Sequence, residues 1–160
     1  MSEELDMQQA KKVFDTLVNM LDSKGWSYDK HEDKLLITSG VKGDDFPIEF
    51  IVLVQPNNQV VQFISRLPFT IPEEKRVDGA IAVCVANFGL VDGSFDYDVS
   101  DGELRYRLTS SYRESTLGEE LFEYMIMVAA NTVDRYNDRF FMLSKGMIDI
   151  QRFMEMDKED

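Results

Sequence analysis

Residues 48–67 read IEFIVLVQPNNQVVQFISRL, two apolar strands joined by a polar turn. Pro56–Gln59 has turn-forming residues, and a loop of two or four residues gives the same register there. This register pairs Val54 with Val61, Val52 with Phe63, Phe50 with Ser65, and Ile48 with Leu67. The face formed by these pairs is predicted to belong to the hydrophobic core.

The opposite face of the same hairpin is also substantially apolar. Its apolar members are Ile51, Leu53, Val60 and Ile64. A sheet with one face in water normally shows a cleaner alternation of polar and apolar residues. We therefore expect this face to be covered, either by another part of the chain or by another protein.

Three further segments have the apolar spacing of amphipathic helices, at steps of three and four. They are residues 7–24, residues 72–88 before Gly89, and residues 116–145. Asp6 with Gln9, and Thr116 with Glu119, match capping boxes for the first and last of these helices. The second helix is expected to bury one stripe, made of Val77, Ile81, Cys84, Val85 and Phe88.

Two shorter hairpins are predicted between the helices. The first joins Trp26–Tyr28 to Lys34–Ser39 through the polar turn Asp29–Asp33. The second turns at Asp101-Gly102, a strong signal for a type I′ turn because both central residues need positive φ. Its register would set Val99 opposite Leu104, Tyr97 opposite Tyr106, Phe95 opposite Leu108, Asp98 opposite Arg105, and Asp96 opposite Arg107.

The predicted elements follow the order α-β-β-β-β-α-β-β-α. The length of 160 residues, with no internal repeat or Ser/Gly linker, indicates a single domain over residues 1–160. Its core is expected over about residues 7–145. Residues 146–160 form a C-terminal Met-rich segment with an acidic tail.

The composition restricts the possible partners. The chain has a net charge of -13, which repels nucleic-acid phosphates and anionic membrane surfaces, so neither is expected as a partner. The acidic start, Met1–Asp6, lacks the basic and apolar regions of a signal peptide, and the apolar runs are too short to span a bilayer. A cytoplasmic protein is therefore expected.

The sequence shows no catalytic, cofactor or metal motif. Gly-x-Ser-x-Gly, Walker-type and Gly-x-Gly-x-x-Gly sequences are absent. His31 is the only histidine and lies in a polar turn, while Cys84 lies on the apolar stripe of a helix. Asp96–Gly102 is similar to a calcium loop, but its glycine stands at the seventh position and Arg107 replaces the required glutamate. No catalytic residue, cofactor or metal ligand is predicted.

Two alternatives to a protein-binding function follow from the charged residues. The many carboxylates could include the site of a small hydrolase or transferase, which would need a pocket containing an acid of shifted pKa. Arg66, Arg105 and Arg113 could form an anion or small-ligand sensor, provided that they converge without acidic partners.

A second apolar group extends beyond the last predicted helix. It consists of Phe140, Phe141, Met142, Met147, Ile150, Phe153, Met154 and Met156. Either this segment folds back over the second face of the sheet, or both patches bind a partner or a second copy of the chain. The residues predicted to bind protein are Ile51, Leu53, Val60, Ile64, Phe141, Met147, Ile150 and Phe153.

The element order resembles that of the YbjN domain family, together with Gly25–Tyr28, the Gly93–Phe95 segment, the Asp101–Arg107 hairpin and the long last helix. The resemblance covers roughly residues 7–145. It implies an α+β fold similar to the type III secretion chaperones, with a mainly antiparallel sheet and helices packed on one face. Members of this family are described as regulators of sensory transduction, so the resemblance implies a non-enzymatic, chaperone-like or regulatory module that acts by protein contact, often as a homodimer.

Overall fold

The computed structural model describes residues 2–160. Its helices and strands are α1 (Ser2–Ser23), β1 (Asp29–His31), β2 (Leu36–Lys42), β3 (Pro47–Gln55), β4 (Val60–Thr70), α2 (Arg76–Phe88), β5 (Ser94–Asp98), β6 (Glu103–Ser111), α3 (Glu119–Ser144) and α4 (Ile150–Lys158). Short 3₁₀ turns precede β2 and α2. The predicted order of elements is confirmed, with α4 added after it.

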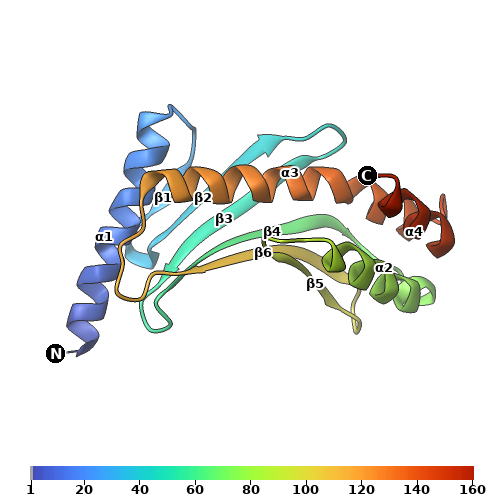
Figure 1. Ribbon diagram of the computed structural model, residues 1–160, viewed down its shortest axis with the longest axis horizontal. Coiled ribbons are helices and arrows are strands. Elements are labelled where there is room, and N and C mark those ends of the chain that lie inside the picture. The colour runs from blue at the N-terminus through green and yellow to red at the C-terminus, as the bar shows by residue number, and fades with distance from the viewer. Residues whose placement is uncertain (1) are drawn as a thin grey trace.

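The six strands form one antiparallel sheet in the order β1-β2-β3-β4-β6-β5. Helix α3 runs along this sheet, α1 crosses one end of it, and α2 and α4 lie together at the other end (Figure 1). The predicted α+β class, with the helices on one face of an antiparallel sheet, is confirmed.

The inward face of the sheet and the helices that cover it share one core. Phe63 stacks on Phe50 with ring centroids 4.7 Å apart, and Phe95 contacts Tyr136 and Phe140 of α3 at 5.5 and 5.1 Å. The β3–β4 register agrees with the prediction, because Val54 pairs with Val61 and Val52 with Phe63.

The first hairpin differs from its prediction. The strand is Asp29–His31, whereas Trp26–Tyr28 precedes it. A 3₁₀ turn at Glu32–Lys34 and Leu35, which has φ of 52°, reverse the chain instead. The reversal therefore takes place later than the polar composition suggested, and His31 is an exposed strand residue.

The register of the β5–β6 hairpin is shifted by two residues from the prediction. Phe95 pairs with Tyr106, Asp96 with Arg105 and Tyr97 with Leu104. The loop is wider than Asp101-Gly102 alone, since the Gly102 amide donates to the Asp98 carbonyl at 2.7 Å. A shift of two keeps every side chain on its predicted face.

Both predicted capping boxes are wrong. Helix α1 begins at Ser2, so Asp6 lies inside it, and the Gln9 amide donates to the carbonyls of Tyr112 and Ser115 at 3.2 and 2.7 Å. Helix α3 begins after Gly118, which supplies no side-chain cap. In α1, Gln9 is engaged by these distant carbonyls and therefore does not act as the capping partner of Asp6.

Most of the predicted stripe of α2 is exposed and a different side of the helix is buried, although Val85 packs half-buried against the core. Gly79, Ala82, Val83 and Ala86 are buried, whereas Val77 and Phe88 are 74% and 94% exposed. Small side chains allow the helix backbone to approach its neighbours closely; a Cβ on Gly79 would lie 2.7 Å from the Tyr97 hydroxyl. The prediction that Cys84 packs in the core is therefore also wrong, because this thiol is exposed.

Candidate protein-binding surfaces

The outward face of the sheet has a broad hollow of about 670 Å³. Its lining contains a row of successive cross-strand neighbours, Asp29, Thr38, Ile51 and Ile64. The helices that contact the sheet do so through its inward residues, and α4 packs against α2 and α3. Within residues 2–160, no helix covers this hollow.

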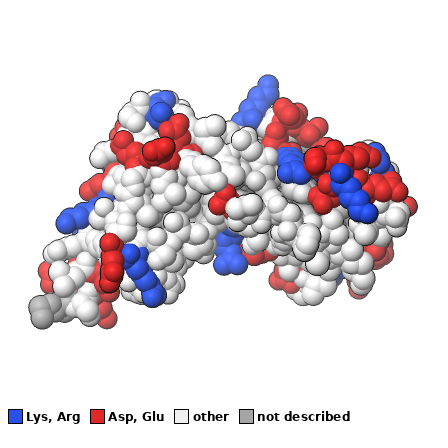
Figure 2. Space-filling view, viewed as in Figure 1, with Lys and Arg blue, Asp and Glu red and all other residues white. Residues whose placement is uncertain are grey.

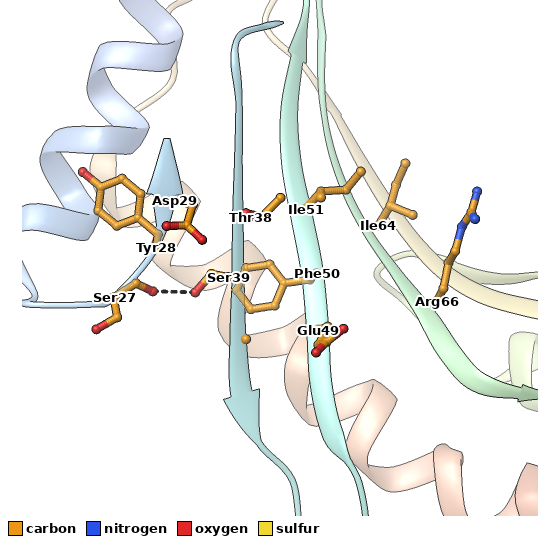
Figure 3. A pocket seen from close by; sticks show the side chains of 11 residues that line it. Ser27, Tyr28, Asp29, Thr38, Ser39, Glu49, Phe50, Ile51, Ile64 and Arg66 are labelled. Atoms are coloured by element: carbon orange, nitrogen blue, oxygen red, sulfur yellow. Dashed lines mark hydrogen bonds between the residues drawn. The ribbon is translucent and has the colours of Figure 1, made fainter. Parts of the chain in front are cut away.

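The centre of the hollow is apolar and its two ends are charged. Ile51 and Ile64 are direct cross-strand partners and point the same way, while Asp29 and Arg66 lie at opposite ends (Figure 3). Ile51 and Ile64 are both half-buried. We call this region, with all the residues drawn in Figure 3, the sheet groove.

One wall of the sheet groove is held by hydrogen bonds. The Ser39 hydroxyl donates to the Ser27 carbonyl at 2.7 Å (Figure 3). The Tyr28 hydroxyl donates to Asp22 of α1 at 2.5 Å, and this bond raises the pKa of Tyr28 to about 12. The wall is therefore tied both to its own hairpin and to a helix.

Leu53 and Val60 lie beside the sheet groove, nearer the β3–β4 turn. Leu53 pairs with Gln62, and Val60 pairs with Gln55. The Gln55 amide donates to Gln62 at 2.7 Å, and Gln62 in turn donates to Thr109 at 3.1 Å. This polar ladder divides the apolar residues, so the four predicted sheet residues lie on one face without forming a continuous apolar patch.

The arginines of this face have acidic partners. Arg66 and Arg105 are cross-strand neighbours, but Arg66 pairs with Glu103 at 3.3 Å and Arg105 with Asp96 at 2.9 Å. Arg107 also reaches Asp96, at 3.0 Å. Arg113 lies beyond the end of β6, two residues after Ser111, so it is separated along the chain from Arg105 and Arg107 within the strand. The paired arginines do not meet the condition set for an anion sensor.

The second predicted group of residues is dispersed. Phe141 packs between Phe46 and Phe69, with centroid distances of 5.3 and 5.4 Å, and Ile150 is half-buried. Met147 is exposed. Phe153 is completely buried against Phe140, so it belongs to the core and cannot reach a partner while α4 is docked. The alternative in which this segment covers the sheet is wrong, because α4 packs against α2 and α3.

A third surface was missed by the sequence analysis. One side of α2, together with Val91 shortly after the helix, exposes only uncharged side chains. We call this surface the α2 face, and it consists of Val77, Ala80, Ile81, Cys84, Phe88 and Val91. The sequence does contain a signal for this surface. A second stripe of mostly small residues, Gly79, Ala82, Val83 and Ala86, has the same helical period as the predicted stripe. Such a stripe competes for the core side of a helix.

The carboxylates give little support to an enzyme. Burial, followed by repulsion from Asp45, raises the pKa of Asp138 on α3. Asp138 does not line the sheet groove, whose acidic residues are Asp29 and Glu49. Among residues 2–160 no group of three or more metal-binding side chains is found.

Comparisons with known proteins identify the fold. No protein-family model and no curated protein matches the sequence. The structure of YbjN from E. coli, a proposed transcription regulator, matches with a TM-score of 0.55 and 12% identity, over 76% of this chain and 85% of YbjN. A structure of the ExsC–ExsE complex matches with a TM-score of 0.55 and 13% identity, over 79% and 92% of the two chains. This chain has the YbjN-like fold.

A chaperone–effector complex, HopA1–SchA, is also similar, with a TM-score of 0.49 and 12% identity over 79% of this chain and 95% of the other. At 12% and 13% identity, this chain shares with YbjN and the ExsC–ExsE structure the YbjN-like, type III secretion chaperone-type architecture, which the sequence resemblance predicted. None of the helices within residues 2–160 is both long and apolar enough to cross a membrane.

Proposed function

We propose that this chain is a non-enzymatic protein-binding module, and that its sheet groove binds an extended segment of a partner protein. The observation that carries the proposal is the uncovered apolar floor made by Ile51 and Ile64. Small-molecule sites usually enclose most of the ligand, whereas this hollow lies on an open sheet face (Figure 3). A segment of protein is the occupant that suits such a surface.

The charges of the sheet groove indicate the chemistry of the segment. Arg66 is 70% exposed at one end, and Asp29 lies at the other. Because Arg66 already pairs with Glu103, a segment with apolar side chains over Ile51 and Ile64 and a basic residue near Asp29 or Glu49 would be complementary. One structure with this fold is itself a complex of two proteins, ExsC and ExsE, which supports a protein partner.

We also propose that the chain forms a homodimer through the α2 face. This surface carries no charge, in a chain with a net charge of -13, so it is a place where two copies can meet with little repulsion. Ala80 and Cys84 are small beside Val77, Ile81 and Phe88. In a twofold contact, the large side chains of one copy can lie over the small ones of the other.

The sheet groove is tested by Ile51→Glu in the full chain. Tagged wild-type and variant proteins are used to capture partners from the source cells, and the affinity of each captured protein is then measured with purified material. We expect Ile51→Glu to weaken binding by about tenfold or more, since a buried interface residue is replaced by a charge. Asn58→Glu, in the exposed β3–β4 turn, adds the same charge as a control. Equal binding by all three proteins would contradict the proposal.

A further inference from the structure

Helix α4 is attached to the rest of the molecule through one aromatic anchor. Phe153 is the only residue of α4 that is fully buried among those described, and its ring lies 5.3 Å from that of Phe140 on α3. Phe140 in turn contacts Phe95 of the sheet at 5.1 Å. Phe153 is therefore the most deeply buried apolar contact of α4, and half-buried Ile150 also packs against the core.

The end of this segment is held by two arginines of α3. Arg139 bonds both carboxylate oxygens of Asp160, with Nη1 to Oδ2 at 2.6 Å and Nη2 to Oδ1 at 2.8 Å. Arg135 bonds Oδ2 at 2.7 and 2.9 Å. The Arg139 side chain is only 13% exposed. Paired arginine donors of this kind are well suited to recognise a carboxylate.

Tyr136 completes the same surface between the two arginines. Both guanidinium groups lie beside its ring, at 5.2 Å for Arg135 and 5.4 Å for Arg139. Its hydroxyl donates to Asp157 at 2.5 Å. Burial, with the Asp157 bond, raises the pKa of Tyr136 to about 12, so this hydroxyl remains a donor at neutral pH. The surface thus binds one aromatic side chain, Phe153, and two acidic side chains, Asp157 and Asp160.

Two of the three side chains that contact this surface, Phe153 and Asp157, lie in α4, and the third, Asp160, follows the C-cap residue Glu159 just beyond the helix. Phe153, Asp157 and Asp160 stand at positions i, i+4 and i+7. Recognition therefore requires a short pattern, an aromatic residue followed by two acids, that the C-terminal end of a helix in another protein can also present.

Features of α4 and of the turn before it would allow another helix to replace α4. The helix has 9 residues, which is too few for stable helix formation in isolation. A turn containing Gly146, with φ of 70°, separates it from α3. Helix α4 consequently gains its order from docking, and a helix with the same pattern would make the same contacts.

We propose that Arg135, Tyr136, Arg139 and Phe140 form a docking site for an acidic amphipathic helix of a partner protein, and that α4 occupies this site until such a helix displaces it. This proposal goes beyond the function proposed above because it uses a different surface. The failure of one therefore leaves the other standing.

The test uses full-length Asp160→Arg, in which a positive charge faces the two arginines. Glu159→Arg is the matched control, because this substitution makes the same change in charge one residue away. Glu159 pairs with Arg152 and not with the two arginines of α3. A fluorescent peptide with the sequence of residues 147–160 serves as the partner helix, and binding is measured by anisotropy. Hydrogen exchange reports whether α4 remains docked.

We expect faster exchange in residues 150–158 of Asp160→Arg alone, and peptide binding at least about tenfold tighter than to wild type or Glu159→Arg. The same peptide carrying Asp160→Arg should not bind. In wild type, excess peptide should accelerate exchange in α4.

Three results would overturn the proposal. Unchanged exchange in Asp160→Arg would make α4 a permanent part of the core. Released α4 without peptide binding would show that the site does not accept a helix in trans. A wild-type dimer that exchanges α4 between copies and excludes the peptide would make a second copy the occupant.

Discussion

The side chain of Asn87 pairs with the backbone of Phe95 as a neighbouring strand would. Its amide nitrogen donates to the Phe95 carbonyl at 3.0 Å, and its amide oxygen accepts from the Phe95 amide at 2.7 Å. Phe95 lies in β5, an edge strand, and an unpaired edge is a template for unwanted strand addition. Helix α2 thus protects this edge through one residue.

Asn87→Ala is expected to lower the free energy of unfolding by about 1–3 kcal/mol, because it leaves two half-buried backbone groups without partners. Urea denaturation measures this change. Asn58→Ala, in an exposed turn, should change the free energy by less than about 0.5 kcal/mol. An equal effect of both substitutions would show that the Asn87 bonds contribute little.

Gly102→Ala is expected to be strongly destabilising. Gly102 has φ of 80°, and a Cβ there would overlap the Ile71 carbonyl oxygen. The Gly102 carbonyl also accepts from the Ile71 amide at 2.9 Å, so the two segments cannot easily separate. A loss of more than about 2 kcal/mol should appear in urea denaturation.

Gly89→Ala is the control for this backbone effect. A Cβ on Gly89 meets nothing within 4 Å, and its φ is -91°. It should leave the stability unchanged or raise it slightly. Similar losses in both variants would argue against strain at Gly102.

Phe88→Glu is expected to convert a dimer of this chain into a monomer. Phe88 is 94% exposed in the single chain and lies on the α2 face. Multi-angle light scattering across a range of protein concentrations measures the mass. Leu5→Glu, at an exposed residue of α1, should leave the mass unchanged. A wild-type monomer at all concentrations would contradict self-association.

The contribution of Asp160 to stability should depend on pH in one direction. Hydrogen bonding to Arg139 lowers the pKa of Asp160 from 3.8 to about 2, against the opposing effect of burial. A carboxyl with a lowered folded-state pKa stabilises the protein fully above its unfolded pKa, and the contribution is lost as the pH falls.

The stability difference between wild type and Asp160→Asn should therefore be constant above about pH 5 and narrow between pH 4 and about pH 2. Urea denaturation at several pH values measures this difference. Asp157→Asn, beside it in the same segment, provides a comparison without the arginine pair. A difference that persists below pH 2 would contradict the role of the ionised carboxylate.

The element order and the β3–β4 register could be predicted because local patterns determine both. Alternating residues from Ile48 to Leu67 place Val52 and Phe63 on one face, and the turn at Pro56–Gln59 selects the register among those that do so. The start of α1 could not be predicted, because Gln9 is used by the distant carbonyls of Tyr112 and Ser115. Contacts between residues far apart in sequence leave no local pattern.

The surfaces were harder to predict than the core. Two stripes of α2 consist of apolar or small side chains, so periodicity could not distinguish Val77 and Phe88 from Gly79 and Ala86. The position of Phe153 depended on where α4 docks, which follows from Arg139 and Phe140 on another helix. The binding roles of Ile51, Leu53, Val60, Ile64, Phe141, Met147 and Ile150, and the cytoplasmic location, stay predictions.

Ionic strength acts on both the α2 face and the ion pairs that Asp160 forms with Arg135 and Arg139, because the chain is strongly acidic. Two copies of a chain with a net charge of -13 repel each other, and dissolved salt screens this repulsion without weakening an uncharged contact. The ion pairs of Asp160 with Arg135 and Arg139 are themselves weakened by the same screening. We therefore expect a rise in salt concentration to favour the proposed pairing of chains through the α2 face and to loosen the last helix, so that a single solution variable changes the two contacts in opposite directions.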